Sequence, residues 1–248
     1  MKYLRQISLG CLFLIAVALV IFFTSSSSNV LKAKLIWFFK YKHKFLDHNK
    51  NALFDIHIEK YNNNKIAITI SGKCYNLSIL TQFNNIGRLY IKDCPIVNLV
   101  SLEGLKTDEL YIGDGTELTS LQGVEKMGIK YLYIFNPILL EDISMLKTSN
   151  IEYLHMPGAK KLKEITSLGN IKTLRYLHIP YSDIDDISPL SNNEKLTIID
   201  IPYTKVKSIK PLQNLPLERL AIKGTPAEHE EIPLILKDAI SEGYKVKF

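Results

Sequence analysis

The strongest constraint on this chain is a pair of apolar residues, separated by one other residue, that recurs seven times along the sequence. The interval between successive pairs is nearly constant, at about 22 residues, and a weaker copy at Ile68 and Ile70 comes one interval earlier. A unit this short cannot bury its apolar edge alone, so successive units have to stack and place their pairs in one parallel sheet. The pairs are Leu89 and Ile91, Leu110 and Ile112, Leu132 and Ile134, Leu154 and Met156, Leu177 and Ile179, Ile199 and Ile201, and Leu220 and Ile222.

Each unit has an internal pattern that changes its period partway along. In the unit from Leu174 to Leu190, apolar residues first alternate with other residues and then occur at every third position. Alternation is typical of a short strand with one apolar face, whereas a spacing of three suits a 3₁₀ turn that points its apolar residues at the same core. The next unit, from Leu196 to Leu215, repeats both parts. The sequence therefore predicts coils made of one short strand and one short turn.

The segment from Ser182 to Leu190 and its echo from Thr204 to Leu212 resemble the leucine-rich-repeat family, in particular the short bacterial repeats of internalins. The resemblance implies an α/β repeat solenoid: a right-handed coil with a parallel β-sheet on its concave side and short 3₁₀ or irregular segments on its convex side. One position departs from the family pattern. Where the family usually has an Asn that bonds the backbone inside the turn, this chain has Cys94, Ser182 or Thr204, which offer fewer hydrogen bonds. We therefore expect a somewhat irregular solenoid.

The exposed ends of a stack of coils need caps. At the front, alternation at 56–58, turn residues at 61–64 and alternation at 66–70 predict a β-hairpin, so that the N-terminal cap and the repeats together span residues 51–226. At the back, residues 227–248 predict a helix followed by a strand, because acidic residues are followed by apolar ones at helical spacing and then by alternation. No residues remain for a second domain.

Residues 1–30 have the pattern of a signal peptide or a membrane anchor. Two basic residues precede an uncharged apolar run from Ile7 to Phe23, and serines follow it. This is the order of a secretory signal, but the run also reaches the lower limit of about 17 residues for a membrane span. Lysines in the basic amphipathic linker at residues 31–50 favour a cytoplasmic solenoid, whereas the short charged start favours export, which we expect. The linker suits either a helix on anionic lipid or a packed connecting helix.

The formal net charge of +6 is not carried by the repeats. Residues 1–50 contain eight Lys and Arg against the single acid Asp47, which gives +7 and leaves −1 for the rest of the chain. A protein that binds nucleic acid needs basic side chains on its folded domain to contact phosphates. We therefore predict no nucleic-acid partner.

The residue between the two apolar members of each pair should point away from the core, because successive strand side chains alternate faces. These residues, and those just before each pair, form columns across the concave face that are rich in tyrosine. Tyrosine offers a wide amphipathic contact area and is frequent at binding hot spots, so this face is the predicted interface; the alternative is that the rings only stack on one another. The predicted contact residues are Tyr90, Tyr111, Tyr131, Tyr133, Tyr153, His155, Tyr176, His178, Asp200 and Tyr203.

Two smaller groups of residues have specific alternatives. His155, His178 and Asp200 occupy successive places in one column, about 5 Å apart, which is conceivable for a metal or an acid–base site. An open sheet offers no closed coordination shell, so we predict polar contacts and no metal. Cys74 and Cys94 are separated by nearly one repeat and fall in neighbouring coils. They would bridge in an exported protein, whereas in a cytoplasmic one Cys94 would simply fill the turn position.

No motif for catalysis accompanies the repeats. The sequence contains no nucleophile elbow, phosphate loop or closed metal motif, so we expect neither an enzyme nor a cofactor. The resemblance implies attachment to a protein partner, such as a host or envelope surface protein. We therefore expect an exported or membrane-anchored protein that binds its partner through the concave face. The alternatives are a structural envelope component with no dedicated ligand and a membrane-tethered cytoplasmic adaptor.

Overall fold

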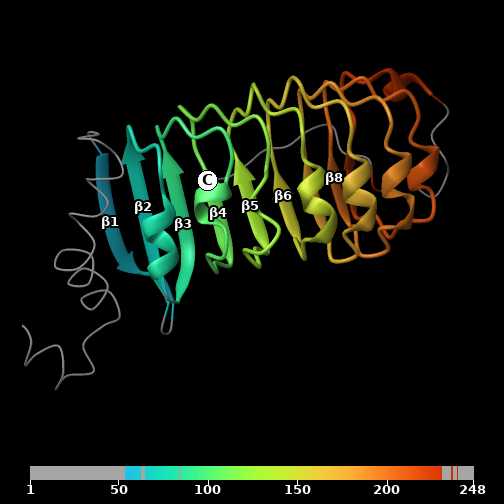
Figure 1. Cartoon of the computed structure of the whole chain (residues 1–248). Helices are drawn as coiled ribbons and strands as arrows, with labels where there is room; N and C mark the ends of the chain where they lie inside the picture. The colour runs from blue at the N-terminus through green and yellow to red at the C-terminus, as the bar shows by residue number, and fades with distance from the viewer. Residues whose placement is uncertain (1–53, 63–64, 84, 231–235, 237–238, 240–248) are drawn as a thin grey trace, which may run out of the picture.

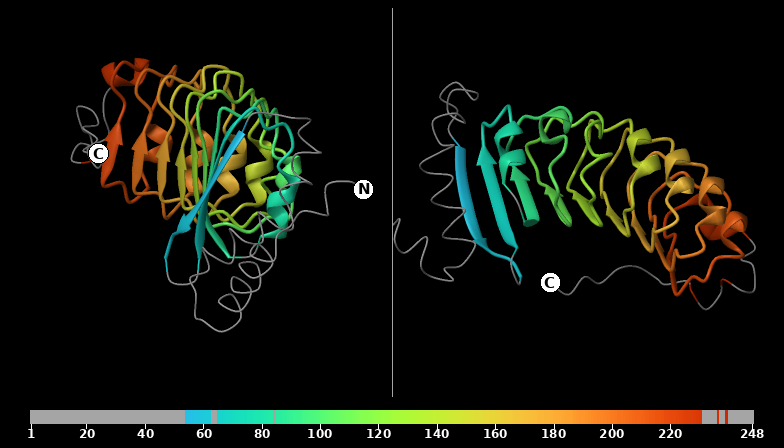
Figure 2. Two further views of the ribbon diagram at one scale, coloured as in Figure 1. Left: turned by 90° about the vertical axis from the view of Figure 1, so that its left-hand side faces the viewer. Right: turned by 60° about the horizontal axis from the view of Figure 1, so that its bottom comes forward.

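The computed structural model describes residues 54–62, 65–83, 85–230, 236 and 239. Their strands stand side by side in one nine-stranded sheet in the order β1 to β9, along the whole length of the molecule (Figure 1). Figure 2 shows the coils stacked in a single curved row. The strands are β1 Phe54–Lys60, β2 Ile66–Gly72, β3 Ile86–Lys92, β4 Glu109–Ile112, β5 Tyr131–Ile134, β6 Tyr153–His155, β7 Tyr176–His178, β8 Ile198–Asp200 and β9 Arg219–Ala221.

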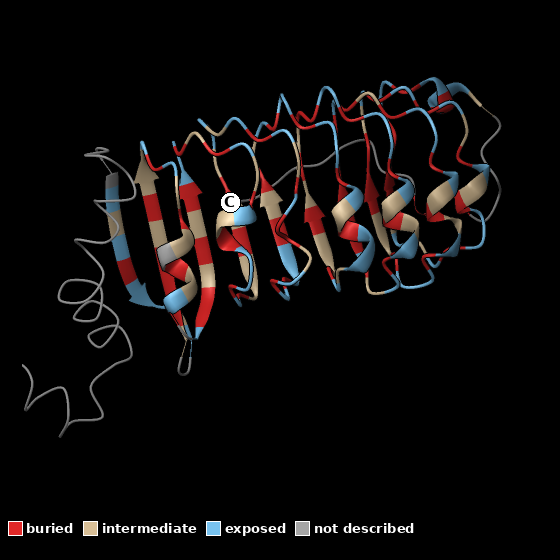
Figure 3. Ribbon diagram, viewed as in Figure 1, coloured by how far each residue is buried: buried red, intermediate tan, exposed pale blue. Residues whose placement is uncertain are grey.

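Strands β2 to β9 are parallel, and their apolar residues are in register from coil to coil. The first apolar residue of each pair lies opposite its equivalent in the next coil, from Leu89 opposite Leu110 to Ile199 opposite Leu220. Both members of every pair are buried, which Figure 3 shows as buried positions alternating with accessible ones along the strands of the N-terminal half. Burying one such side chain contributes about 1.5–3 kcal/mol. The predicted solenoid with a parallel sheet is confirmed.

Short 3₁₀ helices lie on the side of the coils away from the strands (Figure 1). Most of them bury one leucine, such as Leu146 and Leu168, against the common core. This agrees with the predicted period of three. The 3₁₀ helices are η2 Ser78–Gln82, η3 Val100–Leu102, η4 Ser144–Thr148, η5 Thr166–Asn170, η6 Ser188–Asn192, η7 Lys210–Leu212 and η8 Pro226–His229.

A column of short polar side chains, which we call the cap column, precedes the convex turns. Its members recur at the same place in successive coils, and each accepts a hydrogen bond from the backbone N–H two residues later, an arrangement typical of Asn, Asp and Ser. The donor–acceptor distances run from 2.7 Å at Asp142 to 3.4 Å at Ser120 and Ser208. The members that make this bond are Asn76, Asn98, Ser120, Asp142, Asp186 and Ser208.

The turn position that lacks the usual Asn is filled by hydroxyls in the C-terminal coils. The hydroxyls of Ser182, Thr204 and Thr225 each donate to the carbonyl three residues earlier, at 2.9, 2.9 and 2.7 Å. Near the N-terminus the side chains of Cys74 and Cys94 form a disulfide, with their Cα atoms 4.9 Å apart, a separation within the range that disulfides need. Different side chains therefore occupy the same position in different coils.

The two ends of the solenoid differ from the coils. β1 and β2 form an antiparallel hairpin, with Ile56 opposite Ile70. At the other end η8 is a short 3₁₀ helix, and the buried residues Leu236 and Ala239 lie farther along the chain. The carbonyl of Ala239 accepts a hydrogen bond of 2.6 Å from the N–H of Leu220 in β9. The rest of the predicted helix–strand cap at 227–248 falls outside the described residues.

The predicted signal or anchor at residues 1–30 and the linker at 31–50 also fall outside the described residues. Within the part of the chain that is described, no helix combines the length and the apolar character that crossing a membrane requires.

Candidate binding face

Aromatic rings form a ladder across the concave face, in the column between the apolar pairs. Tyr90, Tyr111, Tyr133, His155 and His178 lie opposite one another in successive strands. Their ring centroids are 4.2, 4.2, 5.8 and 4.3 Å apart in that order, and most of the rings are nearly parallel. Such stacked pairs each contribute about 0.5–1.5 kcal/mol beyond the area they bury. Stacking uses the ring faces, so the ladder presents ring edges and polar groups outward.

A second row of tyrosines runs beside the ladder, one residue before each apolar pair. Tyr131 and Tyr153 have ring centroids 6.2 Å apart, and Tyr153 and Tyr176 stack at 3.8 Å with an interplanar angle of 4°. The guanidinium of Arg219 lies 6.0 Å from the centroid of the Tyr176 ring. Tyr133 links the two rows, because its ring centroid is 5.1 Å from that of Tyr153. The two rows thus form one continuous aromatic surface.

Charged side chains pair with one another at the N-terminal end of this surface. Arg88 Nε lies 2.6 Å from Glu109 Oε2, and the Tyr61 hydroxyl donates to Glu109 Oε1 at 2.6 Å. The Tyr111 hydroxyl donates to the same carboxylate at 3.3 Å, and the Arg88 guanidinium lies over the rings of Tyr61 and Tyr111. The hydrogen bond from the Tyr61 hydroxyl to Glu109, together with burial, raises the pKa of Tyr61. The cluster is satisfied internally and leaves little charge for a partner.

The ladder side chains with shifted pKa values are uncharged at neutral pH. Burial raises the pKa of the Tyr90, Tyr111 and Tyr133 hydroxyls, and the Tyr133 phenol and Glu109 raise that of Tyr111 further. Burial, with a smaller contribution from His178, lowers the pKa of His155 to about 4. The middle of the concave face is therefore neutral.

The side chains in the C-terminal part of the concave face are less exposed to solvent than the alternation of strand residues predicts. His178 Nδ1 lies 2.8 Å from Asp200 Oδ2, and the Asp200 side chain is 0% exposed. Tyr176 and His178 are also buried, at 7% and 8% exposure. Alternation fixes which face a side chain lies on but not whether that face is open to solvent. All three residues belong to the predicted columns, but their burial narrows the surface that a partner can reach.

Two of the most exposed aromatic residues lie at the rim where the strands end. Tyr181 and Tyr203 are 54% and 47% exposed, and their rings stack at 4.9 Å with an interplanar angle of 7°. Their φ angles of 58° and 57° lie in the left-handed region, which costs a non-glycine residue roughly 1–2 kcal/mol. Other coils place Gly158 or Asn136 at this position, which adopt the conformation more readily. We call Tyr181 and Tyr203 the rim pair.

A third outward column was not identified from the sequence. It lies three residues after the first member of each apolar pair, and its central members are Phe135, Pro157, Pro180 and Pro202. The centroid of the Phe135 ring is 5.6 Å from that of His155, so Phe135 extends the aromatic surface toward the rim, whereas Pro180 is buried. Counting two residues onward from the ladder would have found it, because strand side chains keep alternating.

The described residues offer little for chemistry on a substrate. Within them, no group of three or more His, Cys, Asp or Glu side chains is arranged to hold a metal ion. His155 and His178 stack face to face instead of converging on a common point. The geometry of this face suits contact between surfaces.

Comparison with known proteins shows which solved structures share this fold. No protein-family model matches this chain, and no curated protein matches it. Two similar solved structures are both internalins from Listeria monocytogenes str. 4b F2365. Internalin C2 is 21% identical with a TM-score of 0.57, over 70% of this chain and 79% of that chain. Internalin F is 21% identical with a TM-score of 0.50, over 67% of this chain and 55% of that chain. The chain is therefore a leucine-rich-repeat solenoid with the fold of the internalins.

Proposed function

We propose that this chain is a protein-binding solenoid whose partner docks on the concave face. The observation that carries the proposal is the ladder of aromatic rings from Tyr90 to His178, together with the exposed rim pair, Tyr181 and Tyr203, where the strands end. A rigid sheet holds these rings in place, so little side-chain freedom is lost when a partner binds. Tyrosine is also among the residues that contribute most to binding at protein interfaces.

Exposure indicates which rings a partner touches first. Tyr131 is 36% exposed, and the rim pair is more exposed still, whereas the ladder is half-buried from Tyr90 to His155 and buried at His178. Tyr131 and the rim pair therefore provide the anchors, and the ladder supplies hydroxyls and ring edges between them. Because the ladder is neutral and Arg88 is already paired with Glu109, the matching centre of the partner is an uncharged surface.

The compartment follows from the N-terminal sequence and the cysteines. We propose that residues 1–30 export the solenoid or anchor it in a membrane, with the repeats outside the cytoplasm, where a Cys74–Cys94 bridge persists. The partner is then a host or envelope surface protein. Protease treatment of intact cells producing the chain with a C-terminal tag tests this. Digestion of the tag from outside is expected, and protection until lysis would instead support a membrane-tethered cytoplasmic adaptor.

Site-specific photo-cross-linking tests the binding face itself. A photoreactive residue at Tyr131 or Tyr181 should form an adduct with one defined protein in intact cells, because both side chains are exposed on the proposed surface. Val100 is a matched control, since it is 44% exposed but lies in η3 on the convex side. The adduct at Tyr131 should be lost when Tyr181 and Tyr203 are both replaced by Ala. Equal adducts from Val100, or none from either tyrosine, would contradict the proposal.

A second candidate function is purely structural, and the close stacking of the ladder favours it. If the rings only stabilise the sheet, Tyr111→Ala and Tyr133→Ala should lower the free energy of unfolding by about 1–3 kcal/mol each, from lost stacking and burial. They would then leave every cross-linked adduct unchanged once the variant is folded. If the face binds a partner, the adducts weaken at temperatures where both variants remain fully folded.

A further inference from the structure

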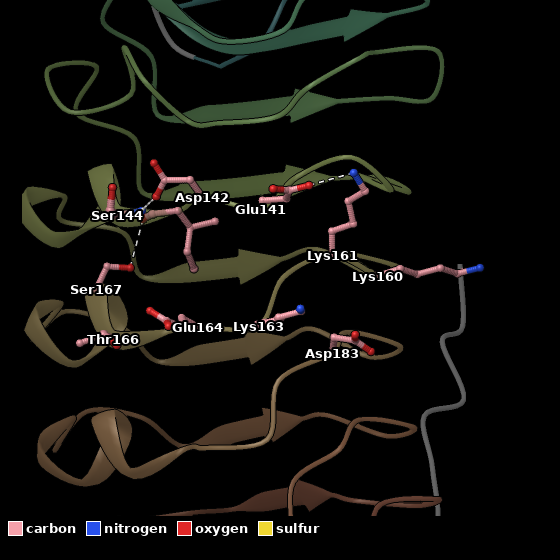
Figure 4. A pocket seen from close by; sticks show the side chains of 11 residues that line it. Glu141, Asp142, Ser144, Lys160, Lys161, Lys163, Glu164, Thr166, Ser167 and Asp183 are labelled. Carbon is pink, nitrogen blue, oxygen red and sulfur yellow. Dashed lines mark hydrogen bonds and ion pairs between the residues drawn. The ribbon is translucent and has the colours of Figure 1, made fainter.

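A polar pocket with a volume of about 620 Å³ opens on the flank of the solenoid, where the chain passes from the strands to the convex turns (Figure 4). Its walls come from the segments that lead into η4 and η5, and Asp183 of the following coil closes one side. The volume is within the range of about 300–1,000 Å³ that small-molecule sites occupy. Most such sites are lined by apolar side chains, but ten of the eleven residues that line this one are charged or carry a hydroxyl, and their aliphatic parts form the rest of its surface with Ile143.

The cap column changes its residue type at this pocket. Glu164 occupies the place that Asp142 and Asp186 take one coil before and one coil after it. Those two carboxylates bond the N–H groups of Ser144 and Ser188, whereas the Glu164 carboxylate makes no hydrogen bond or ion pair among the described residues. The longer Glu side chain lines the pocket instead.

Most of the other charged groups around the pocket are already paired. Lys161 Nζ lies 2.8 Å from Glu141 Oε1, and Asp183 Oδ2 lies 2.9 Å from Lys205 Nζ. Figure 4 shows the Glu141–Lys161 pair on one side of the pocket and Asp183 on the other. These pairs fix the walls and leave no net charge on them.

Lys160, whose ammonium points away from the other lining groups in Figure 4, Lys163 and Glu164 have no such partner among the described residues, and the last two residues lie in the middle of the pocket. Figure 4 shows the Glu164 carboxylate pointing to the side of Thr166 and Ser167 and the Lys163 ammonium pointing to the opposite side, toward Asp183. Neither group makes a hydrogen bond or an ion pair within the described part of the chain. Three hydroxyls stand near them: Ser144 and Ser167 with Thr166 at the starts of η4 and η5. The pocket thus combines an ammonium, a carboxylate and hydroxyls within one small volume.

We propose that this pocket binds a neutral oligosaccharide. A sugar hydroxyl both donates and accepts hydrogen bonds, so different hydroxyls of one oligosaccharide can accept from Lys163 on one side of the pocket and donate to Glu164 on the other. An apolar ligand would cover both charges without pairing them, and an anion would face the carboxylates of Glu164, Glu141 and Asp183.

The proposal is independent of a protein partner on the concave face. Full-length protein is mixed with cellotriose, maltotriose, mannotriose or chitotriose, and binding is measured by saturation-transfer NMR and calorimetry. At least one of these sugars should bind with a Kd of about 1 mM or lower. Lys163→Ala and Glu164→Ala should each weaken that binding at least about tenfold, since each removes a charge-assisted hydrogen bond.

Matched variants separate this site from the rest of the surface. Glu194 and Lys195 are also adjacent, exposed and of opposite charge, but they lie outside the pocket, so Glu194→Ala and Lys195→Ala should leave sugar binding unchanged. Tyr131→Ala, on the concave face, should also leave it unchanged. The proposal is overturned if no sugar binds at about 10 mM, if the control variants weaken binding equally, or if only inorganic phosphate binds and does so through Lys163.

Discussion

Glu164→Asp should make the solenoid more stable by restoring the cap column in its one interrupted coil. The backbone there already has the required shape. The residue after Glu164, Ile165, has φ −123° and ψ 23°, close to −117° and 15° at Ile143 and to −115° and 10° at Ile187 in the flanking coils. Only the length of the side chain differs, so an Asp should accept the N–H of Thr166.

The expected gain is about 0.5–1 kcal/mol. A hydrogen bond from a side chain to a free backbone N–H at the start of a helical turn typically contributes about 0.5–2 kcal/mol, and an exposed site falls at the lower end. The substitution keeps the negative charge and removes one methylene group from an exposed side chain, so no packing is lost. Asp186→Glu is the mirror control. It should cost at least as much, because the Asp186 carboxylate bonds both the N–H and the hydroxyl of Ser188, at 2.8 and 2.7 Å.

Urea unfolding at neutral pH measures both changes. The midpoint should rise for Glu164→Asp and fall for Asp186→Glu, with the slope m unchanged in both. Amide hydrogen exchange at Thr166 should become slower in the first variant, which locates the effect. A midpoint that is unchanged or lower for Glu164→Asp, at constant m, would refute the view that side-chain length alone interrupts the column.

Three further perturbations test the core, the ladder and the disulfide. Leu177→Asp places an unpaired charge in the shared core and should split thermal unfolding into two transitions; an unchanged single transition would contradict the register of the coils. The folded-state pKa of His155 is about 4, below its ordinary value of 6.5, so the unfolded chain takes up the proton first as the pH falls. Stability should therefore be complete above pH 6.5 and fall by roughly 1–2 kcal/mol toward pH 4, after allowing for partial exposure. His155→Tyr should remove that part of the pH dependence of the urea midpoint, and an identical dependence in both proteins would argue against a neutral buried imidazole. Replacing Cys74 and Cys94 by Ser should lower stability by about 3 kcal/mol, because the bridge closes a loop with a sequence separation of 20; a dithiothreitol-insensitive urea midpoint in the parent protein would argue against the bridge.

The strand register was predictable from the sequence because the constraint is local and repeated. Leu177 can stack only on its equivalents one coil away, and a shift by one residue would turn every apolar side chain outward. The positions of Tyr90 and Tyr133 on the opposite face follow from the same alternation. The cap column is an equally regular signal, since Asn, Asp or Ser recurs every 22 residues from Asn76 to Ser208 except at Glu164.

Other features depend on contacts that no local pattern encodes. Nothing around Asp200 in the sequence indicates that its side chain is fully buried, because alternation fixes the face of a strand residue but not its exposure. The left-handed backbone at Tyr181 and Tyr203 was not predictable from residue type, since tyrosine rarely adopts it, although Asn136 and Gly158 at equivalent positions are typical of it. The pocket on the flank could not be predicted, because the sequence does not show which charged side chains pair across coils.

The constant interval of the cap column makes the coils interchangeable in evolution. Duplication or loss of the DNA that encodes one repeat, such as residues 143–164, would join two equivalent points of neighbouring coils and leave no mismatched junction. Each event would change the contour length of the molecule by one strand spacing, about 4.8 Å. The distance between the two ends of this protein can therefore be adjusted in equal steps without a new kind of contact between coils.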